Sequence, residues 1–181
     1  MHKLRVTELN RLTSEEYKSV KKLPLVVVLD HVRSLNNVGA VFRIADAFRI
    51  ESIYLCGITA TPPNAEIHKT ALGAEETVEW HYCKDTLDCV KELKSKGYYL
   101  CAIEQVEGSL SLEKIDLTSD RKFAIILGHE VKGVQQEVID ECYCCIEIPQ
   151  FGTKHSLNVS VAAGIVSWEF FKYLKNRELG I

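Results

Sequence analysis

The sequence predicts an α/β fold in which a mainly parallel sheet is flanked by helices. Short apolar runs, typical of strands buried on both faces, alternate along the chain with amphipathic helical segments. The composition, with 46% hydrophobic and 26% charged residues, is that of an ordinary globular protein. We see no linker, repeat or low-complexity segment, and 181 residues suffice for one domain with a full core.

The N-terminal elements follow from capping and apolar patterns. Thr13 and Glu16 have the spacing of a capping box, so a short helix is expected to begin there and to end at Pro24. Residues 25–30 have the apolar pattern of a buried strand, and Asn37 is the expected N-cap of the next helix. The apolar face of that helix would contain Val38, Val41, Phe42, Ala45 and Phe48.

The rest of the chain continues the alternation of strands and helices. Strands are expected over residues 52–56, 77–82, 98–103, 123–127 and 144–148. Helices are expected over residues 65–71, 135–140 and 157–176, and between the capping residue Asp85 and the terminating Gly97. A parallel sheet brings the carboxyl ends of its strands to one edge, so the polar residues that follow these strands are expected to form one site there.

The segment 148–162 is the most informative part of the chain. A strand-like run ends at Pro149, a polar loop follows, and a helix then opens with Ser156, Asn158 and Ser160. These side chains and the free N–H groups of the first helical turn either bind a ligand or cap a core helix.

Residues 36–43 combine asparagine, small residues and arginine. Gly39 and Ala40 leave the first turn of the expected helix bare, so that a ligand or another backbone can approach it. Arg43 lies six residues after Asn37, on the flank of the apolar face. The alternative interpretation is a plain N-cap at Asn37 and a surface arginine.

Residues 125–134 form a buried strand that ends in Gly128, and Glu130 and Gly133 follow within a short loop. The glycines allow tight backbone turns, and Glu130 would lie at the sheet edge among arginines or backbone N–H groups. An ordinary turn after the strand is the alternative.

The three motifs, in this order, resemble the signature motifs of the SpoU/TrmH branch of the SPOUT superfamily, the RNA ribose 2′-O-methyltransferases. The resemblance extends from about Pro24 onward. It implies a fold whose C-terminal segment forms a deep trefoil knot, a homodimer through the C-terminal helix, S-adenosylmethionine as cofactor and tRNA or rRNA as substrate. Such an enzyme requires no metal.

The resemblance also implies roles for individual residues. Arg43 would engage the ribose 2′-hydroxyl, either as a base or by orienting the hydroxyl and stabilising the alkoxide; the second is favoured because a guanidinium is a poor proton acceptor. Glu130 would position that arginine or shape the knot loops, while Asn37, Ser156 and Asn158 would complete the polar site. The cofactor would be held mainly by backbone groups of Ile103, Glu104, Leu127, Gly128, Ile148, Ser156 and Leu157.

The charge distribution separates a basic arm from an acidic body. Residues 1–22 carry six Lys or Arg and three Glu, whereas the rest of the chain has a net charge of −6. We therefore expect a helical N-terminal arm, 1–22, and a SPOUT methyltransferase domain, 23–181. The arm would face RNA or would be a solvated helix surface. Because no separate N-terminal RNA-binding domain is expected, a compact tRNA or an exposed rRNA loop is favoured, and His155 would contact it or face solvent.

The seven cysteines lie mostly within apolar runs, which predicts reduced core thiols in a reducing compartment. Cys142, Cys144 and Cys145 are close in sequence, but neighbours on a strand point to opposite faces and cannot all bind one ion. No apolar run approaches the ~20 residues that span a bilayer, and the N-terminus lacks the apolar region of a signal peptide. We expect a cytoplasmic protein.

Three alternatives stay open. A protein of the same fold could bind RNA or the cofactor without catalysis, or could methylate a different RNA atom or a different molecule. An unrelated nucleotide-binding α/β domain is the third, although the chain lacks the Gly-x-Gly-x-x-Gly and P-loop motifs.

The aromatic residues of the C-terminal helix fit either a dimer interface or the core of the monomer: Trp168, Phe170, Phe171 and Tyr173.

Overall fold

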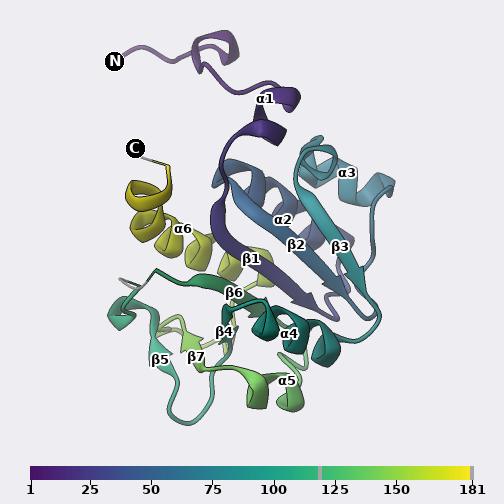
Figure 1. Cartoon of the computed structure of the whole chain (residues 1–181), viewed down its shortest axis with the longest axis vertical. Helices are drawn as coiled ribbons and strands as arrows, with labels where there is room; N and C mark the ends of the chain where they lie inside the picture. The colour runs from purple at the N-terminus through teal and green to yellow at the C-terminus, as the bar shows by residue number, and fades with distance from the viewer. Residues whose placement is uncertain (118–119, 180–181) are drawn as a thin grey trace.

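The computed structural model describes residues 1–117 and 120–179, and within them a seven-stranded sheet lies between helices (Figure 1). The strands are β1 (Leu23–Asp30), β2 (Ile50–Cys56), β3 (Glu79–Cys83), β4 (Tyr98–Ile103), β5 (Leu110–Ser111), β6 (Lys122–Leu127) and β7 (Cys144–Glu147). They are arranged in the order β3-β2-β1-β6-β4-β7-β5, and each neighbouring pair is parallel. The predicted α/β fold is confirmed. The last two residues of the expected 23–181 domain lie outside the described residues.

Helices cover both faces of the sheet. The α-helices are α1 (Ser14–Ser19), α2 (Leu35–Ala47), α3 (Ala65–Ala71), α4 (Thr86–Ser95), α5 (Gln136–Glu141) and α6 (Val159–Glu178). Short 3-10 helices are η1 (Val6–Glu8), η2 (Ala74–Glu76) and η3 (Leu112–Lys114). Helices α2 and α6 pack on one face, whereas α4 and α5 pack on the other. None of the described helices combines the length and hydropathy needed to cross a lipid bilayer.

The apolar run of β1 divides between two cores. Leu25, Val27 and Leu29 point into the core shared with α2 and α6. Val26 and Val28 point into the core shared with α4 and α5. Because β1 is buried on both faces, its sequence is apolar at successive positions instead of alternating with polar residues.

The sheet register brings the carboxyl ends of the central strands together. Strand β6 lies between β1 and β4, with Val28 opposite Ile126 and Ala102 opposite Ile126. Strand β7 continues the edge, with Ile103 opposite Ile146. The loops that follow β4, β6 and β7 therefore leave the sheet side by side.

Asp30, the last residue of β1, ties two helices to this edge. Its carboxylate is fully buried and accepts hydrogen bonds from Thr86 Oγ1 over 2.7 Å and from the Gln135 backbone N–H over 2.9 Å. Gln135 Nε2 donates a further bond over 2.8 Å. Since Thr86 begins α4 and Gln135 precedes α5, this carboxylate fixes the starts of both helices, and its burial is compensated by these donors.

Two boundaries differ from the sequence expectations by more than two residues. Helix α1 ends at Ser19, and Pro24 is instead the second residue of β1, where the pairing with β2 shifts register between Leu23 and Val26. Proline lacks a backbone N–H, so the irregular start of a strand can accommodate it. Helix α2 begins three residues earlier than expected, because Ser34 rather than Asn37 is its N-cap.

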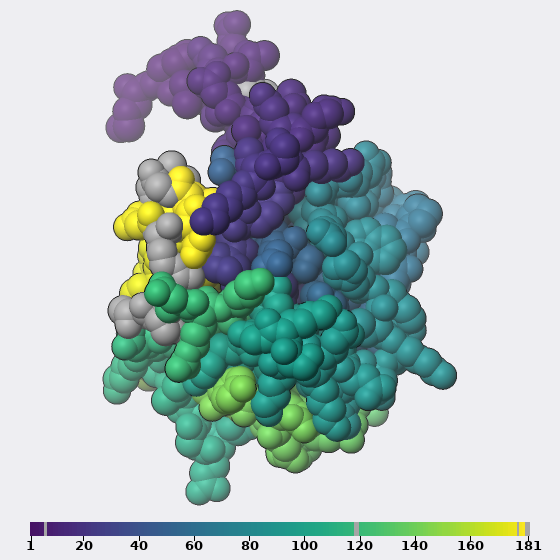
Figure 2. Space-filling model, in the orientation of Figure 1, coloured from purple at the N-terminus to yellow at the C-terminus, as the bar shows by residue number. Residues whose placement is uncertain are grey.

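The N-terminal arm projects from the body and is anchored near its end (Figure 2). The predicted capping box is confirmed: Thr13 Oγ1 accepts from Glu16 N over 3.2 Å, and Glu16 Oε2 accepts from Thr13 N over 2.7 Å. Tyr17 is buried in the main core, and its hydroxyl donates to the Ala45 carbonyl over 3.4 Å. The basic residues Arg5 and Arg11 before this anchor are exposed.

Candidate functional site

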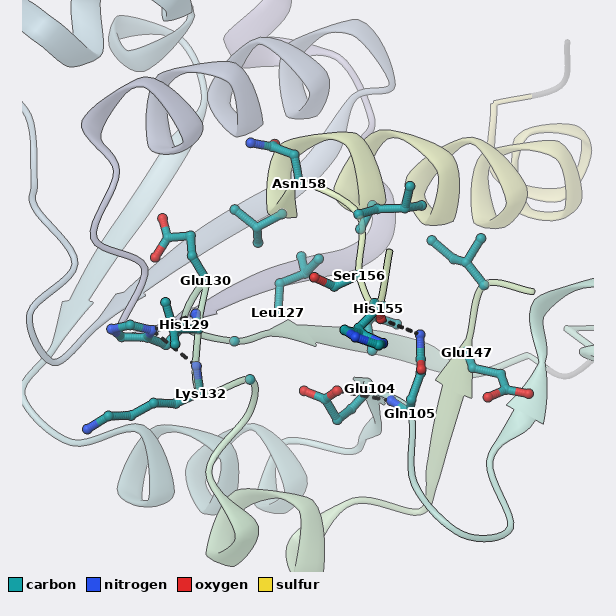
Figure 3. Close-up of a pocket in the computed structure, with 18 of the residues that line it drawn as sticks. Glu104, Gln105, Leu127, His129, Glu130, Lys132, Glu147, His155, Ser156 and Asn158 are labelled. Carbon is teal, nitrogen blue, oxygen red and sulfur yellow. Dashed lines mark hydrogen bonds between the residues drawn. The ribbon is translucent and has the colours of Figure 1, made fainter. Parts of the chain in front are cut away.

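A pocket of about 500 Å³ lies at the carboxyl edge of the sheet (Figure 3). Three parts of the chain line it. They are residues 103–105 at the end of β4, residues 127–133 at the end of β6, and residues 146–148, 150 and 155–159, from β7 through the following loop to the start of α6. Pockets of this size accommodate small-molecule cofactors. The motif segments chosen from the sequence at 125–134 and 148–162 thus meet here.

Most of the residues singled out from the sequence line this pocket. The seven expected cofactor-binding residues all do so: Ile103, Glu104, Leu127, Gly128, Ile148, Ser156 and Leu157. Glu130 and Asn158 line it as well. Asn37 lies behind them and contacts both through its side chain.

The loop after β6 is compact and depends on its glycines. His129 N donates to the Gly133 carbonyl over 3.1 Å, and Gly133 N donates back to the His129 carbonyl over 2.8 Å. His129 Nδ1 accepts a further bond from Val131 N over 3.0 Å. A Cβ atom on Gly128 would lie 2.1 Å from the Gly133 carbonyl carbon, so only glycine fits there without moving backbone.

Glu104 holds this loop against the end of β4. Its Oε2 accepts from Val134 N over 3.0 Å, and its Oε1 accepts from Gln105 N over 3.0 Å. Gly133 has a φ of +70°, and a Cβ there would lie 2.1 Å from Glu104 Oε2. The carboxylate therefore fastens one pocket wall to another.

Glu130 fastens the same loop to the segment that precedes α2. Its carboxylate accepts from Arg33 N over 3.0 Å, from Ser34 N over 2.9 Å and from Asn37 Nδ2 over 3.1 Å. Partial burial raises the pKa of Glu130, but these donors hold the resulting pKa below its usual value. Glu130 is thus a carboxylate that crosslinks the loop after β6 to the segment before α2 and to the first turn of α2.

Asn158 completes the polar network at the start of α6. Its Nδ2 donates to Asn37 Oδ1 over 3.1 Å, while its Oδ1 accepts from Ser160 N over 2.9 Å and caps the helix. Helix α6 therefore begins at Val159, with Asn158 and not Ser156 as its cap. Ser156 lines the pocket and is exposed.

The structure does not bring Arg43 to this network. Arg43 lies on an exposed strip of α2, in a second pocket whose walls include Arg11, Trp168 and Phe171. No hydrogen bond or ion pair joins the side chains of Arg43 and Glu130, two described residues. The arrangement in which Glu130 positions the arginine is therefore absent from this protomer.

Gly39 serves helix packing and not a ligand. A Cβ atom there would lie 2.3 Å from the carbonyl oxygen of Ile67 in α3 and 2.1 Å from Thr70 Oγ1. The sequence left open whether a ligand or another backbone approaches this bare turn. The structure shows that the backbone of α3 does so.

The loop between β7 and α6 is open. Among the described residues, no backbone–backbone hydrogen bond involves residues 149–157. One side-chain contact spans the pocket, from Gln105 Nε2 to the His155 carbonyl over 3.3 Å, as Figure 3 shows. Apart from the His155 carbonyl, the N–H and C=O groups of this loop are thus available to a ligand.

Sequence reasoning missed several polar residues of the pocket wall. Gln105, Lys132, Glu147 and Gln150 all line it. Gln105 directly follows Glu104, and Lys132 lies inside the Gly128–Gly133 loop. Their position in the sequence beside predicted site residues could have identified both as pocket residues.

In a comparison with known protein families, residues 24–168 of this chain match the family described as "SpoU rRNA Methylase family". The chain belongs to this family. A relative from Nitrosomonas europaea, named 23S rRNA (guanosine-2′-O-)-methyltransferase RlmB, is 32% identical over 174 residues, which cover 95% of this chain and 66% of the relative. A second RlmB, from Neisseria meningitidis, is 30% identical over 149 residues, covering 82% of this chain and 58% of the relative.

Solved structures of SpoU relatives share the fold. An AdoMet-bound rRNA methyltransferase from Sinorhizobium meliloti superposes with a TM-score of 0.78 at 26% identity, over 92% of this chain and 62% of that one. The TrmH/SpoU tRNA modifying enzyme of A. aeolicus has a TM-score of 0.80 at 24% identity, over 91% and 82% of the two chains. The chain thus spans between 58% and 66% of the curated relatives named above.

Proposed function

We propose that this SpoU family member transfers a methyl group from S-adenosylmethionine to a ribose 2′-hydroxyl of tRNA or rRNA. The observation that carries the proposal is the pocket itself. Residues from three distant segments, chosen from the sequence as cofactor-binding positions, all line one cavity of about 500 Å³. The relatives named as guanosine-2′-O-methyltransferases favour guanosine as the methylated nucleoside.

The pocket suits a cofactor that is bound mainly by backbone groups. Ile103, Leu127 and Ile148 give it apolar walls, and the loop 149–157 offers free backbone groups. When bound, S-adenosylmethionine supplies an electrophilic methyl group on a sulfonium. Glu104 and Glu130 are engaged in holding loops, so their task is to keep the pocket shaped and not to move protons.

Arg43 is the proposed catalytic residue. A guanidinium orients a ribose hydroxyl and stabilises the alkoxide that develops as the proton leaves, without accepting that proton itself. Because Arg43 does not line the cofactor pocket of its own chain, we assign it to the pocket of a partner protomer.

A homodimer through α6 is the proposed assembly. Val161, Ile165 and Trp168 are exposed and recur at helical spacing on one side of α6. The Trp168 ring lies 5.8 Å from Phe48 and 5.6 Å from Phe171, in the aromatic cluster that borders the Arg43 pocket. Exposed aromatic and aliphatic side chains in such a row are typical of subunit interfaces.

The basic arm and the pocket rim would contact the RNA. Arg5 and Arg11 on the arm are exposed, and Lys132 and His155 lie on the rim. Phosphate contacts of this kind position an RNA without reading its sequence.

The deciding experiment is methyl incorporation from labelled S-adenosylmethionine into undermethylated tRNA and rRNA, followed by nucleoside mass spectrometry. A 2′-O-methylated nucleoside is the expected product. Binding of S-adenosylhomocysteine without turnover on either RNA pool, or on precursor particles, would instead assign the chain to cofactor-binding proteins without catalysis. A base-methylated nucleoside would contradict ribose as the acceptor.

A further inference from the structure

Three thiols gather at the carboxyl edge of the sheet, on two strands and one helix that the cofactor pocket does not use. The Sγ atoms of Cys56, Cys83 and Cys89 all lie within 4.8 Å of one another. Cys56 and Cys89 are buried, with 0% and 2% exposure, whereas Cys83 is half-buried. The cluster has no part in the proposed methyl transfer.

Rigid elements hold the three thiols in place. Cys56 is the last residue of β2 and Cys83 the last residue of β3, and the two are direct partners in the parallel ladder. Cys89 comes from α4, one helical turn after Thr86, whose hydroxyl is bonded to the buried Asp30. Two neighbouring strands and one helix thus each contribute one sulfur atom to the same small volume.

The spacing suits a single metal ion. Thiolates bind Zn²⁺ at ~2.3 Å, which places the sulfur atoms of one site roughly 4 Å apart. The observed upper limit of 4.8 Å therefore requires only a small contraction of the cluster. Thiolate sulfur is also the ligand that selects soft or borderline cations over Mg²⁺ and Ca²⁺.

We propose that Cys56, Cys83 and Cys89 bind one Zn²⁺ ion, with a water molecule as the fourth ligand. Three thiolates and Zn²⁺ leave one net negative charge, whereas Cu⁺ would leave two, at a higher desolvation cost in a buried site. Solvent reaches the half-buried Cys83 side, where the fourth position of a tetrahedron would be filled.

No fourth histidine, cysteine or carboxylate of the described residues joins this group at the same spacing. Glu92, one turn further along α4, is engaged in an ion pair with Lys96 over 2.6 Å. The site therefore uses three protein ligands. Its effect is structural, because the ion would fasten α4 to the ends of β2 and β3.

A second cysteine pair provides an internal control. Cys101 and Cys144 face each other across β4 and β7 with their sulfur atoms 3.6 Å apart, but they form a pair and not a group of three. Loss of Cys144 therefore removes a thiol of similar exposure without touching the proposed site.

The experiment is a Cd²⁺ titration of the whole chain, kept reduced with a phosphine, in which the thiolate-to-metal charge-transfer band is followed in the ultraviolet. We expect one Cd²⁺ per chain, displaced by Zn²⁺, and a rise in the unfolding midpoint on saturation. Cys83→Ser should lose the band, and Cys144→Ser should keep it.

Two results of the titration would overturn the proposal: absence of a saturable band in the wild-type chain, or a band of full size in folded Cys83→Ser. X-ray absorption of the wild-type Cd²⁺ complex gives an independent measure that does not depend on a variant. Three sulfur neighbours are expected there, and two or fewer would exclude the site.

Discussion

Asn158 donates a hydrogen bond to Asn37 over 3.1 Å, although 121 residues separate them in the sequence. The contact joins the start of α6 to the first turn of α2. Through Asn37 it continues to Glu130 and from there to the segment before α2. The three motif segments recognised in the sequence are thus joined by side-chain hydrogen bonds into one polar network behind the pocket.

Substitutions at Asn158 should separate its two tasks. Asn158→Ala loses both the helix cap and the bond to Asn37, so we expect the free energy of unfolding to fall by about 1–2 kcal/mol. Asn158→Asp retains an acceptor for the Ser160 N–H but lacks the donor, so it should keep more of the stability while losing methyl transfer. Urea unfolding and the methylation assay measure the two effects. Equal destabilisation by both variants would contradict the capping role.

Glu130→Gln should change how stability depends on pH. The pKa of Glu130 is lowered in the folded protein, so its charged form stabilises the fold above the unfolded value near 4.5, and this contribution is lost as the pH falls through the folded value. We expect the variant to be less stable than wild type at neutral pH and the difference to shrink in acid. Urea unfolding of wild type and variant, measured from neutral to acid pH, tests this expectation. Glu107→Gln, on an exposed loop, is the control. A difference that stays constant with pH would disprove the assignment.

Gly128→Ala should damage the pocket selectively. The added Cβ would meet the backbone of Gly133 at 2.1 Å, so the loop must move away from the cofactor site. Overpacking of this kind typically costs 1–3 kcal/mol, and we expect S-adenosylhomocysteine to bind about tenfold or more weakly by calorimetry. Gly152→Ala is the matched control, since a Cβ there meets nothing within 4 Å. Unchanged affinity in a folded Gly128→Ala protein would show that the loop is not part of the cofactor site.

Arg43→Ala should abolish methyl transfer, with a loss of at least ~10²–10³-fold, and leave S-adenosylhomocysteine affinity nearly unchanged, because Arg43 lies outside the cofactor pocket. Mixing this variant with Gly128→Ala adds a second test. If Arg43 serves the partner's pocket, mixed dimers contain one intact site and regain activity. If it serves its own pocket, the mixture stays inactive.

Trp168→Glu should convert the protein to a monomer. The substitution places a charge in the exposed apolar row of α6, where desolvation opposes association. Light scattering after size exclusion measures the mass, and Leu110→Glu on the exposed edge strand β5 is the control. A dimer that persists in the Trp168 variant would direct attention to another surface.

The sequence was sufficient to predict the sheet but not the contacts between its loops. Strands such as β1 and β6 are apolar at successive positions because both faces are buried, and that pattern is local. The capping box at Thr13 and the cap at Asp85 are local as well, and the structure contains both. The two-residue strand β5 has too few residues for any pattern to be visible.

The contacts that were not predicted arise where segments distant in sequence meet. Glu130 could not be assigned to the Arg33 and Ser34 N–H groups, because 97 and 96 positions separate these residues in the chain. Arg43 has the motif spacing expected for catalysis, yet spacing along one helix does not tell which pocket its exposed side faces. The thiols of Cys56, Cys83 and Cys89 likewise become neighbours only when β2, β3 and α4 pack together.

The central position of β6 has a consequence for the order of folding. During synthesis β1, β2, β3 and β4 all emerge before β6, yet β1 and β4 are each hydrogen-bonded to β6 and not to each other. The inner edges of both strands stay unpaired until residue 127 is available, and closing the sheet then joins segments far apart in the chain. Such non-local pairing slows folding, and until the sheet closes it leaves unpaired strand edges exposed that are prone to aggregation. We therefore expect slow refolding, and a nascent chain that depends on chaperones until β6 inserts.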